Sequence, residues 1–575
     1  MFAGPIFSRE ALTAPRQTRH FLIRSGYVAA MFVLTYTAAQ ATFGWQSVRN
    51  VGDIARFGSL LFQIFSIVQV TLMMFFALLF AAGNVAQEKD RQTLILLLMT
   101  DLRDPELVLG KLWASFLTVA VLIAASVPIF GVVYLLGGVT LEQIGWSLGV
   151  CVAAALAAGS WGTLVAYWRE KTFQTLAIGV LGMVLLIGVS QAVSSLSGPG
   201  SAIGYAAGLL NPYGALSEIL DPLARQSGLD VRPVSALGPV LALLGLSLIL
   251  NVVTTLRLRI WNPNRSVFIP TKTEEVAGQA LTESKHRVIW NNPVIWREVR
   301  TRAYGRKMFA IKLAYLAVVG FAVVYLRQAG AESDLVLGMI SPLGFAVVGL
   351  SLISLMLVNA QGVTALTGER DGQTLELLLM TDVTAGEFIF GKLGGILYNT
   401  KELILIPPAI IGYFAFRGTV SLENFLFILI GFLVLVGFAS MLGLHSGLSF
   451  ENSRSAIANS LGTMFFLFIG IFIFMLLLVE ARSSFFVQFQ SFIVFIGVGS
   501  LGLYSSLGHK NPSAALRIAS GLLPFLTFYS ITEFLLNGTL GVCLWISVAY
   551  GFATVAMLIP AVSELDVALG RATLD

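Results

Sequence analysis

Apolar runs of about 20 residues recur along the whole chain, and they restrict its possible folds more than any other feature. A helix of that length crosses the roughly 30 Å hydrocarbon core of a membrane. Of the 575 residues, 56% are hydrophobic and only 12% are charged, and the mean hydropathy is +0.83. Such a composition excludes an ordinary soluble protein. The sequence therefore predicts an all-α polytopic membrane protein.

The apolar runs predict about 12 transmembrane helices in two groups of six. The first six spans are 21–43, 58–86, 112–137, 142–168, 173–196 and 235–256. The second six are 308–326, 335–365, 393–416, 424–448, 456–479 and 540–562. Two further apolar stretches, 484–507 and 513–537, form an insertion, 484–537, that we expect to be re-entrant or to lie in the outer leaflet.

The sequence carries no pattern for a disulfide, a metal or a cofactor. Cys151 and Cys543 both lie in apolar runs, without a CxxC or Cys/His neighbour. We therefore expect both cysteines to be packing residues. The basic N-terminus before the first apolar run resembles a signal peptide, but that run is long for a signal core, so we expect a true span.

A charged stretch occurs twice between apolar runs. The first polar segment, residues 88–111, reads EKDRQTLILLLMTDLRDPELVLGK, and the second, residues 369–392, reads ERDGQTLELLLMTDVTAGEFIFGK. They align without a gap, and 15 of the 25 positions 88–112 are identical to 369–393. We call the shift that takes Glu88 to Glu369 the repeat offset, and the same shift takes Glu170 to Glu451. Each half of the chain is thus one copy of a six-span unit.

The repeat divides the chain into three parts. Residues 1–256 form the first half, 257–292 a basic linker, and 293–575 the second half. Six spans is an even number, so we expect two tandem parallel repeats with one orientation. With the linker inside, 25 of the 36 Lys and Arg fall on the cytoplasmic side. The positive-inside rule then places both termini and both polar segments in the cytoplasm.

Each polar segment contains a short amphipathic helix. Leu94, Leu97 and Leu98 are spaced i, i+3, i+4, as are their counterparts Leu375, Leu378 and Leu379, and this spacing places each set on one helix face. Amphipathicity alone is also typical of a helix that anchors in the interface. Docking on a partner is favoured because both copies also keep the charged start, the Gln-Thr-Leu and the Thr-Asp.

These segments resemble the signature loop of the ABC-2 type transporter permeases, which is similar to E-K/R-E/D-x-G-T-L-E-L-L-L-x-T-P-x-S-x-x-E-x-x-x-G-K. The second segment is close to it throughout, whereas the first has Arg91 and Ile95 in place of Gly372 and Glu376. NPVIWRE before span 308–326 and GLLNPYGAL before span 235–256 also resemble the family. The resemblance implies two fused permease halves with cytoplasmic coupling helices.

The resemblance also implies partners and contact residues. The chain would be the permease subunit of an ATP-driven transporter, an exporter in the cell inner membrane, served by two copies of a separate ATP-binding subunit. The implied contacts are Glu88, Asp90, Thr93, Leu94, Leu97, Leu98, Thr100 and Asp101, with Glu369, Asp371, Thr374, Leu375, Leu378, Leu379, Thr381 and Asp382. The helix before each first span, here the lead helix, carries Arg9 and Glu10 in one half and Arg297 and Glu298 in the other.

Other functions remain open. GEFIFGKL at 386–393 matches a phosphate-binding loop, but Leu393 replaces the required Ser or Thr, so we expect no ATPase site here.

A major-facilitator-like secondary transporter also has two parallel six-span halves, and a scaffold needs no transport site. Lys401 and Glu402 are adjacent charges within a span, and we expect them to neutralise each other or to reach the inner surface. We expect interhelical hydrogen bonds from Asn359 and His445, and no nucleic-acid role.

Overall fold

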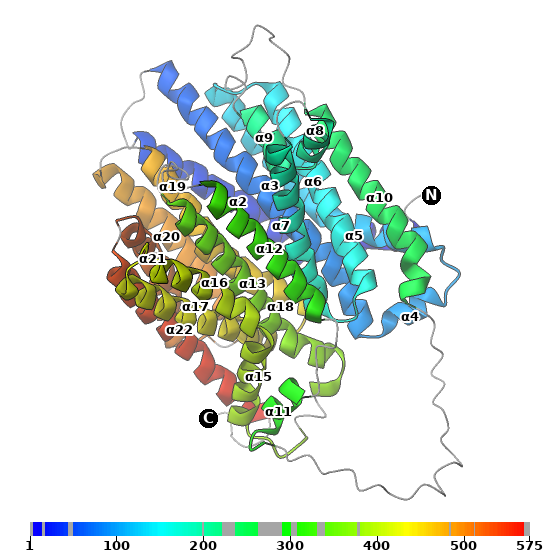
Figure 1. Ribbon diagram of the computed structural model, residues 1–575. Helices are drawn as coiled ribbons and strands as arrows, with labels where there is room; N and C mark the ends of the chain where they lie inside the picture. Colours follow the sequence, from blue (N-terminus) through cyan, green and yellow to red (C-terminus); the bar gives the residue numbers. More distant parts are fainter. Residues whose placement is uncertain are drawn as a thin grey trace, which may run out of the picture.

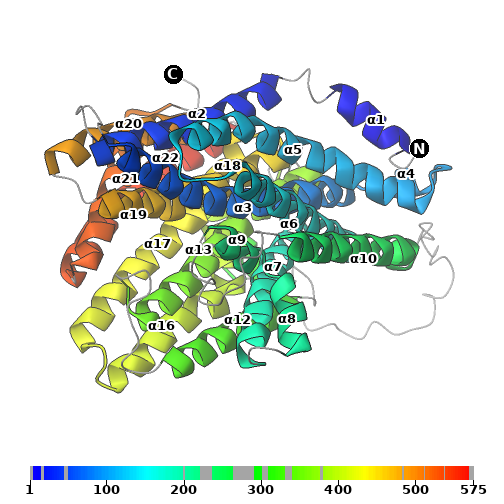
Figure 2. The same cartoon turned by 90° about the horizontal axis from the view of Figure 1, so that it is seen from above.

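A computed structural model shows a bundle of long helices (Figures 1 and 2). The residues described are 4–13, 18–43, 50–197, 201–220, 236–262, 290–300, 308–329, 340–375, 380–481, 485–510, 512–536 and 538–568. In Figure 1, α4, α11 and α15 lie at the lower end of the bundle, and α8 and α9 lie at the upper end. We call the lower end the polar-segment side, because it holds the described parts of both polar segments.

The first half contains ten helices within its described residues. They are α1 (Gly4–Thr13), α2 (Thr18–Phe43), α3 (Val51–Asp90), α4 (Thr93–Leu98), α5 (Asp104–Leu136), α6 (Leu141–Trp168), α7 (Thr172–Leu196), α8 (Ala202–Leu209), α9 (Pro212–Leu220) and α10 (Leu237–Trp261).

The second half has a similar succession of helices. They are α11 (Pro293–Arg300), α12 (Met308–Ala329), α13 (Pro342–Asp371), α15 (Ala385–Asn399), α16 (Lys401–Phe416), α17 (Leu422–Ser449), α18 (Ser453–Phe465), α19 (Ile471–Ala481), α20 (Phe485–Leu507), α21 (Ala514–Leu535) and α22 (Thr539–Ala568). A π-helical turn, η2 (Phe466–Gly470), joins α18 to α19.

Twelve helices in the described part of the chain are long and apolar enough to cross a membrane. The protein is therefore an all-α, multi-pass membrane protein, as the sequence predicts. The twelve are not the same set as the expected spans, because they include α20 and α21 and leave out α2, α15 and α16. The expected insertion 484–537 thus consists largely of two full-length helices, and the expected span 393–416 is broken at Thr400.

Helix bounds repeat at the same offset as the polar segments. Helix α6 runs from Leu141 to Trp168, and α17 runs from Leu422 to Ser449, so both ends coincide after the shift. The C-terminal ends of α3 and α13 also coincide, as do the starts of α7 and α18. The structure of the polar-segment side therefore follows the sequence repeat.

One helix crossing forms the centre of each half. In the first half α3 packs against α6, and in the second half α13 packs against α17. A Cβ atom added at Gly162 of α6 would lie 2.9 Å from the carbonyl oxygen of Leu78. At Gly443 of α17, the equivalent position, it would lie 2.6 Å from the carbonyl oxygen of Asn359. Small residues let membrane helices approach this closely.

The halves share their core. Helix α2 of the first half packs against α19 and α20 of the second, and α12 of the second half packs against α7 of the first. One buried cluster joins Leu181 of α7 to Tyr315 of α12, and another joins Met31 of α2 to Phe474 of α19. The two halves are thus held together by apolar contacts on two sides.

Buried polar side chains bond between the helices. Asn359 Nδ2 donates to the carbonyl oxygen of Ala439 at 3.0 Å, and Oδ1 accepts from Ser460 Oγ at 2.8 Å. His445 Nε2 lies 2.8 Å from the carbonyl oxygen of Leu507. The expected interhelical bonds of Asn359 and His445 are confirmed.

Candidate functional site

The two polar segments begin with the same backbone turn. Gln92 has φ 58° and Gln373 has φ 54°, and they are the only described non-glycine residues with positive φ. The turn follows the end of a long helix, α3 in the first half and α13 in the second, and it redirects the chain. In both copies a threonine hydroxyl then donates to the carbonyl oxygen of the segment's first glutamate, Thr93 to Glu88 at 3.3 Å and Thr374 to Glu369 at 3.1 Å.

The basic residue after the first glutamate of each segment, Lys89 or Arg370, joins the end of α3 or α13 to the end of α6 or α17. Lys89 Nζ donates to the carbonyl oxygens of Tyr167 and Arg169, the latter at 2.9 Å. In the second half, Arg370 Nη1 donates to the carbonyl oxygens of Gly447 at 3.1 Å and Phe450 at 2.6 Å. These carbonyls end α6 and α17, which satisfies groups that a helix end leaves unpaired.

The aspartate that ends each long helix binds the start of another helix. Asp90 Oδ2 accepts a hydrogen bond from Thr172 Oγ1, and Asp371 Oδ2 accepts one from Ser453 Oγ. Thr172 begins α7 and Ser453 begins α18. Asp90 and Asp371 therefore bind within the chain, although the resemblance implied contacts with a partner.

Between α6 and α7, burial lowers the pKa of the Arg169 guanidinium, and the negative charge of Glu170 acts in the opposite direction and raises it.

Helix α4 turns two of its expected anchor leucines inward. Leu94 is 3% exposed and Leu98 is 8% exposed, and both pack with Leu107, Tyr167 and Leu258, while Leu97 is half-buried. The amphipathic pattern did predict the shared face. We expected that face to bind a partner, but Leu94 and Leu98 bind the rest of this chain instead.

The opposite face of α4 is apolar and open. Ile95 is 45% exposed, Leu96 is 65% exposed and Met99 is 72% exposed. The sequence did not predict this face. An i, i+3, i+4 pattern identifies one apolar side of a helix, and it does not show whether apolar residues on the other side are exposed. Thr93, Thr100 and Asp101 are also exposed there.

The second segment is described in part. Leu375 is half-buried against the core of the second half, and Met380, the counterpart of Met99, is 87% exposed. Leu378 and Leu379 lie outside the described residues. Thr381 and Asp382 are exposed, and each interacts with another residue of the chain.

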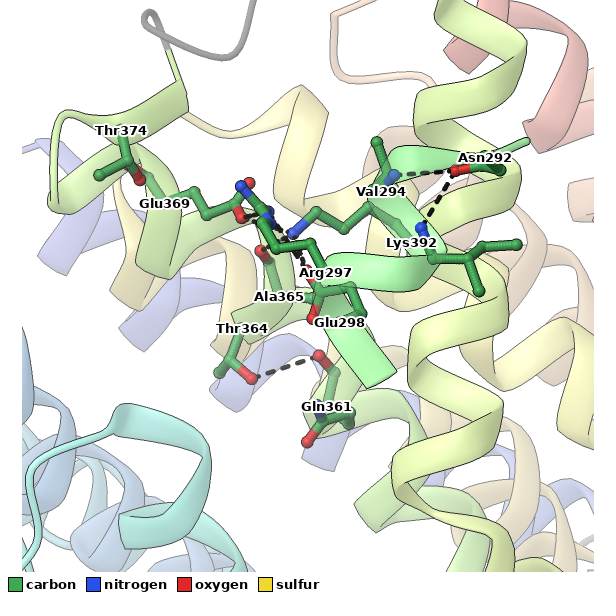
Figure 3. A network of polar contacts seen from close by, with 11 residues as sticks. Asn292, Val294, Arg297, Glu298, Gln361, Thr364, Ala365, Glu369, Thr374 and Lys392 are labelled. Atoms are coloured by element: carbon green, nitrogen blue, oxygen red, sulfur yellow. Dashed lines mark hydrogen bonds and ion pairs between the residues drawn. The ribbon is translucent and has the colours of Figure 1, made fainter. Parts of the chain in front are cut away.

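A group of four charges, of which Lys392 and Glu298 are buried and Arg297 is 34% exposed, ties the second segment to its lead helix (Figure 3). Lys392 Nζ lies 2.6 Å from Glu298 Oε1 and 2.6 Å from Glu369 Oε1, and Arg297 Nη2 pairs with both carboxylates. The side chain of Lys392 is 1% exposed, that of Glu298 2% and that of Glu369 17%. Two cations and two carboxylates balance, as burial requires. Glu369 and Glu298 thus point inward, which the sequence did not predict.

The first segment repeats part of this group. Lys111 Nζ pairs with Glu88 Oε1, and the side-chain exposures are 8% and 23%. Arg9 of lead helix α1 is exposed and interacts with another residue, and the side chain of Glu10 lies outside those described. The Lys–Glu pair that joins the two ends of each segment is therefore common to both halves.

The lead helices dock at equivalent places. Helix α1 packs on α5 and α11 packs on α15. Asn292, which precedes α11, donates from Nδ2 to the carbonyl oxygen of Glu387 at 2.8 Å. In the first half, a Cβ atom at Gly4 would lie 3.1 Å from Cβ of Glu106, the counterpart of Glu387.

The two segments contact each other through Arg91. Its Nη2 lies 3.2 Å from Asp371 Oδ1, and the Asp371 side chain is 4% exposed. Asp371 is also close enough to Asp90 for their charges to interact. Arg91 stands where the second segment has Gly372, so this ion pair has no counterpart in which the two segments exchange roles.

The described site joins the polar segments to the ends of several long helices. Within the described ranges, no group of three or more His, Cys, Asp or Glu side chains is placed to hold a metal ion. No family model matches the chain, and no curated protein matches its sequence. The arrangement joins an exposed apolar helix to the ends of several long apolar helices.

Proposed function

We propose that this chain is the membrane subunit of an ATP-driven transporter of the ABC-2 permease type, with both permease halves fused. The observation that carries the proposal is the exposed apolar face of α4 and the residue after it, Ile95, Leu96 and Met99, on a helix that packs against the ends of α5, α6 and α10. Twelve apolar helices give the architecture of a membrane transporter. The duplicated segments suit two copies of one partner.

The exposed face has the character of an interface core. Apolar side chains on a short helix that are surrounded by polar ones match the pattern of a buried anchor inside a polar rim. Thr93, Thr100 and Asp101 supply the rim at α4. The partner is a separate ATP-binding subunit that receives α4 in a groove, and the segment around Met380 receives a second copy.

The inward leucines and ion pairs transmit the partner's movement. Leu94 and Leu98 join α4 to α5, α6 and α10, and the Lys111–Glu88 pair joins the ends of α3 and α5. In the second half, Lys392 joins α13, α15 and α11. A partner that displaces the segment would therefore displace the ends of three helices together, since these contacts are buried and resist separation.

The remaining features of the proposal come from the positive-inside rule and from the resemblance to ABC-2 type permeases. Both polar segments, the linker and both termini face the cytoplasm of a cell whose inner membrane holds the protein. Transport runs outward, as an exporter. The chain itself hydrolyses no ATP, needs no cofactor and binds no nucleic acid. A secondary transporter would have the same helices but no use for the exposed apolar face of α4, and a scaffold would bind a partner there without coupling the contact to ATP hydrolysis.

Co-purification tests this proposal. The chain is expressed with the ATP-binding protein encoded next to it, and complex formation is compared for the wild type, Leu96→Ser and Ile203→Ser. Ile203 is 71% exposed on α8 at the opposite end of the bundle, which makes it a control matched to Leu96 at 65%. We expect Leu96→Ser to weaken binding at least about tenfold, as loss of an interface anchor does. Equal binding by all three would reject docking on α4.

A further inference from the structure

Four polar side chains gather on the outer surface of the second half, at the break between α15 and α16. Glu402 Oε1 lies 2.5 Å from Lys312 Nζ of α12. Lys401 Nζ lies 4.2 Å from the centre of the Tyr398 ring. The break is at Thr400, with φ −104° and ψ 11°. Glu402 therefore pairs across helices with Lys312 and not with its neighbour Lys401, so of the two expected alternatives the mutual pair is wrong.

This polar cluster opens toward lipid. Lys312 and Glu402 each have a side chain that is 35% exposed, and Lys401 is exposed. Around them, Leu397 is 41% exposed and Leu405 is 63% exposed. Exposed leucines on helices of a membrane bundle face hydrocarbon, so the cluster lies at the boundary of the protein with its lipids.

The cluster lies close to one membrane surface. Lys312 is four residues into α12, so it lies about 6 Å along the helix from its start. That start follows α11, which is on the polar-segment side (Figure 1). Lysines at this level reach the headgroups, and tyrosine is typical of the same zone.

The cluster has an excess of positive charge. Glu402 balances Lys312, but among the described residues no carboxylate pairs with Lys401. An anion with a hydrogen-bond acceptor would complement this arrangement.

The fold does not require the polar side chains on α15 and α16. At the repeat offset, the first half has Leu117, Ala120 and Val121 in place of Tyr398, Lys401 and Glu402. These three counterparts are apolar, and α5 is continuous where α15 and α16 are separate. Lys312 follows the alignment of the lead helices, in which Arg24 stands at its position. Charges facing lipid are costly and usually functional, so the restriction of Lys401 and Glu402 to one half indicates a specific role.

We propose that Lys401, Tyr398 and Lys312 bind the phosphate headgroup of an anionic phospholipid in the leaflet on the polar-segment side. The Lys401 ammonium and the Tyr398 hydroxyl contact the phosphate, and Lys312 adds charge from the neighbouring helix. Basic pockets between helices on this side of a membrane suit such headgroups. The inference rests on the membrane architecture and does not depend on the proposed transport function.

Lipid quenching tests it on the full chain in nanodiscs. A fluorophore on Leu397→Cys reports contact with brominated phosphatidylglycerol or brominated phosphatidylcholine, since Cys151 and Cys543 are buried. We expect a preference of about fivefold for phosphatidylglycerol, the effect of one lysine near the surface. Lys401→Ala should remove the preference, and Lys401→Arg should keep it.

A matched control lies at the other end of α16. There, Cζ of Arg417 lies 5.5 Å from the centre of the Tyr413 ring, a cation–aromatic contact like that of Lys401 with Tyr398. Arg417→Ala should leave the preference for phosphatidylglycerol unchanged. Equal quenching by both lipids in the otherwise unaltered chain would overturn the proposal, as would a preference that survives Lys401→Ala. Loss of the preference on adding soluble glycerol phosphate would assign the site to free phosphate esters and overturn the lipid assignment.

Discussion

Arg91 of the first polar segment and Asp371 of the second form an ion pair between the two halves of the chain, with Nη2 3.2 Å from Oδ1. The pair joins the ends of α3 and α13, where Asp90 and Asp371 come close. Other cations lie near the same junction, Arg370 near Asp371, and Lys89 and Lys171 near Asp90.

We predict that Arg91→Glu separates the polar segments. The change replaces an attraction to Asp371 by a repulsion, in a site where the Asp371 side chain is 4% exposed and its charge is poorly screened. Spin labels on Met99→Cys and Met380→Cys, both exposed, would report a longer distance by double electron–electron resonance. Arg91→Lys should keep the original distance, and an unchanged distance in Arg91→Glu would refute the link between the halves.

We predict that Lys392→Met destabilises the protein strongly. The change leaves Glu298, with a side chain 2% exposed, without its closest cation, and loss of one partner of a buried pair costs on the order of 3–5 kcal/mol. Thermal unfolding in detergent should show a clear fall in midpoint. The double variant Lys392→Met, Glu298→Gln should recover part of the loss; if the double variant were worse than the single one, the pair would not be the cause.

We predict that Gly443→Ala weakens the packing of α13 on α17. The added Cβ would lie 2.6 Å from the carbonyl oxygen of Asn359, and overpacking of this kind costs roughly 1–3 kcal/mol. Gly431→Ala on the same helix is the control, since a Cβ there meets nothing within 4 Å. The unfolding midpoint should fall for Gly443→Ala only, and equal midpoints would contradict the close crossing.

We predict that both polar segments are cytoplasmic. Cysteines at Met99 and Met380, which are 72% and 87% exposed, should react with a membrane-impermeant reagent only after the cells are opened. A cysteine at Ile203, at the other end of the bundle, should react in intact cells. Labelling of Met99→Cys or Met380→Cys from outside would reverse the proposed topology.

The sequence was sufficient for the helical membrane architecture and for the position of the repeated site. Apolar runs report local burial in lipid, and the repeat offset relates Gln92 to Gln373 without any structure. The shared face of Leu94, Leu97 and Leu98 on α4 also followed from their spacing, although its contact with the rest of this chain did not. These features depend on neighbouring residues or on direct repetition.

Contacts between distant segments could not be predicted in this way. Glu402 chooses Lys312, which is 90 residues away, over the adjacent Lys401, because helix packing determines which charges meet. Glu369 points inward for the same reason, since Lys392 and Arg297 reach it from α15 and α11. The open face of α4 depends on which side the core covers, and a pattern of apolar residues does not show that.

The central claim is that an ATP-binding subunit docks on the open face of each polar segment. The most direct measurement is site-specific photocrosslinking from Met99 and from Met380 in membranes that contain the chain and the ATP-binding protein encoded beside it. The account predicts a crosslink to that protein from both positions, and two copies per chain in the mass of the purified complex. Crosslinks only to lipid, with no ATP-binding protein in the complex, would contradict it.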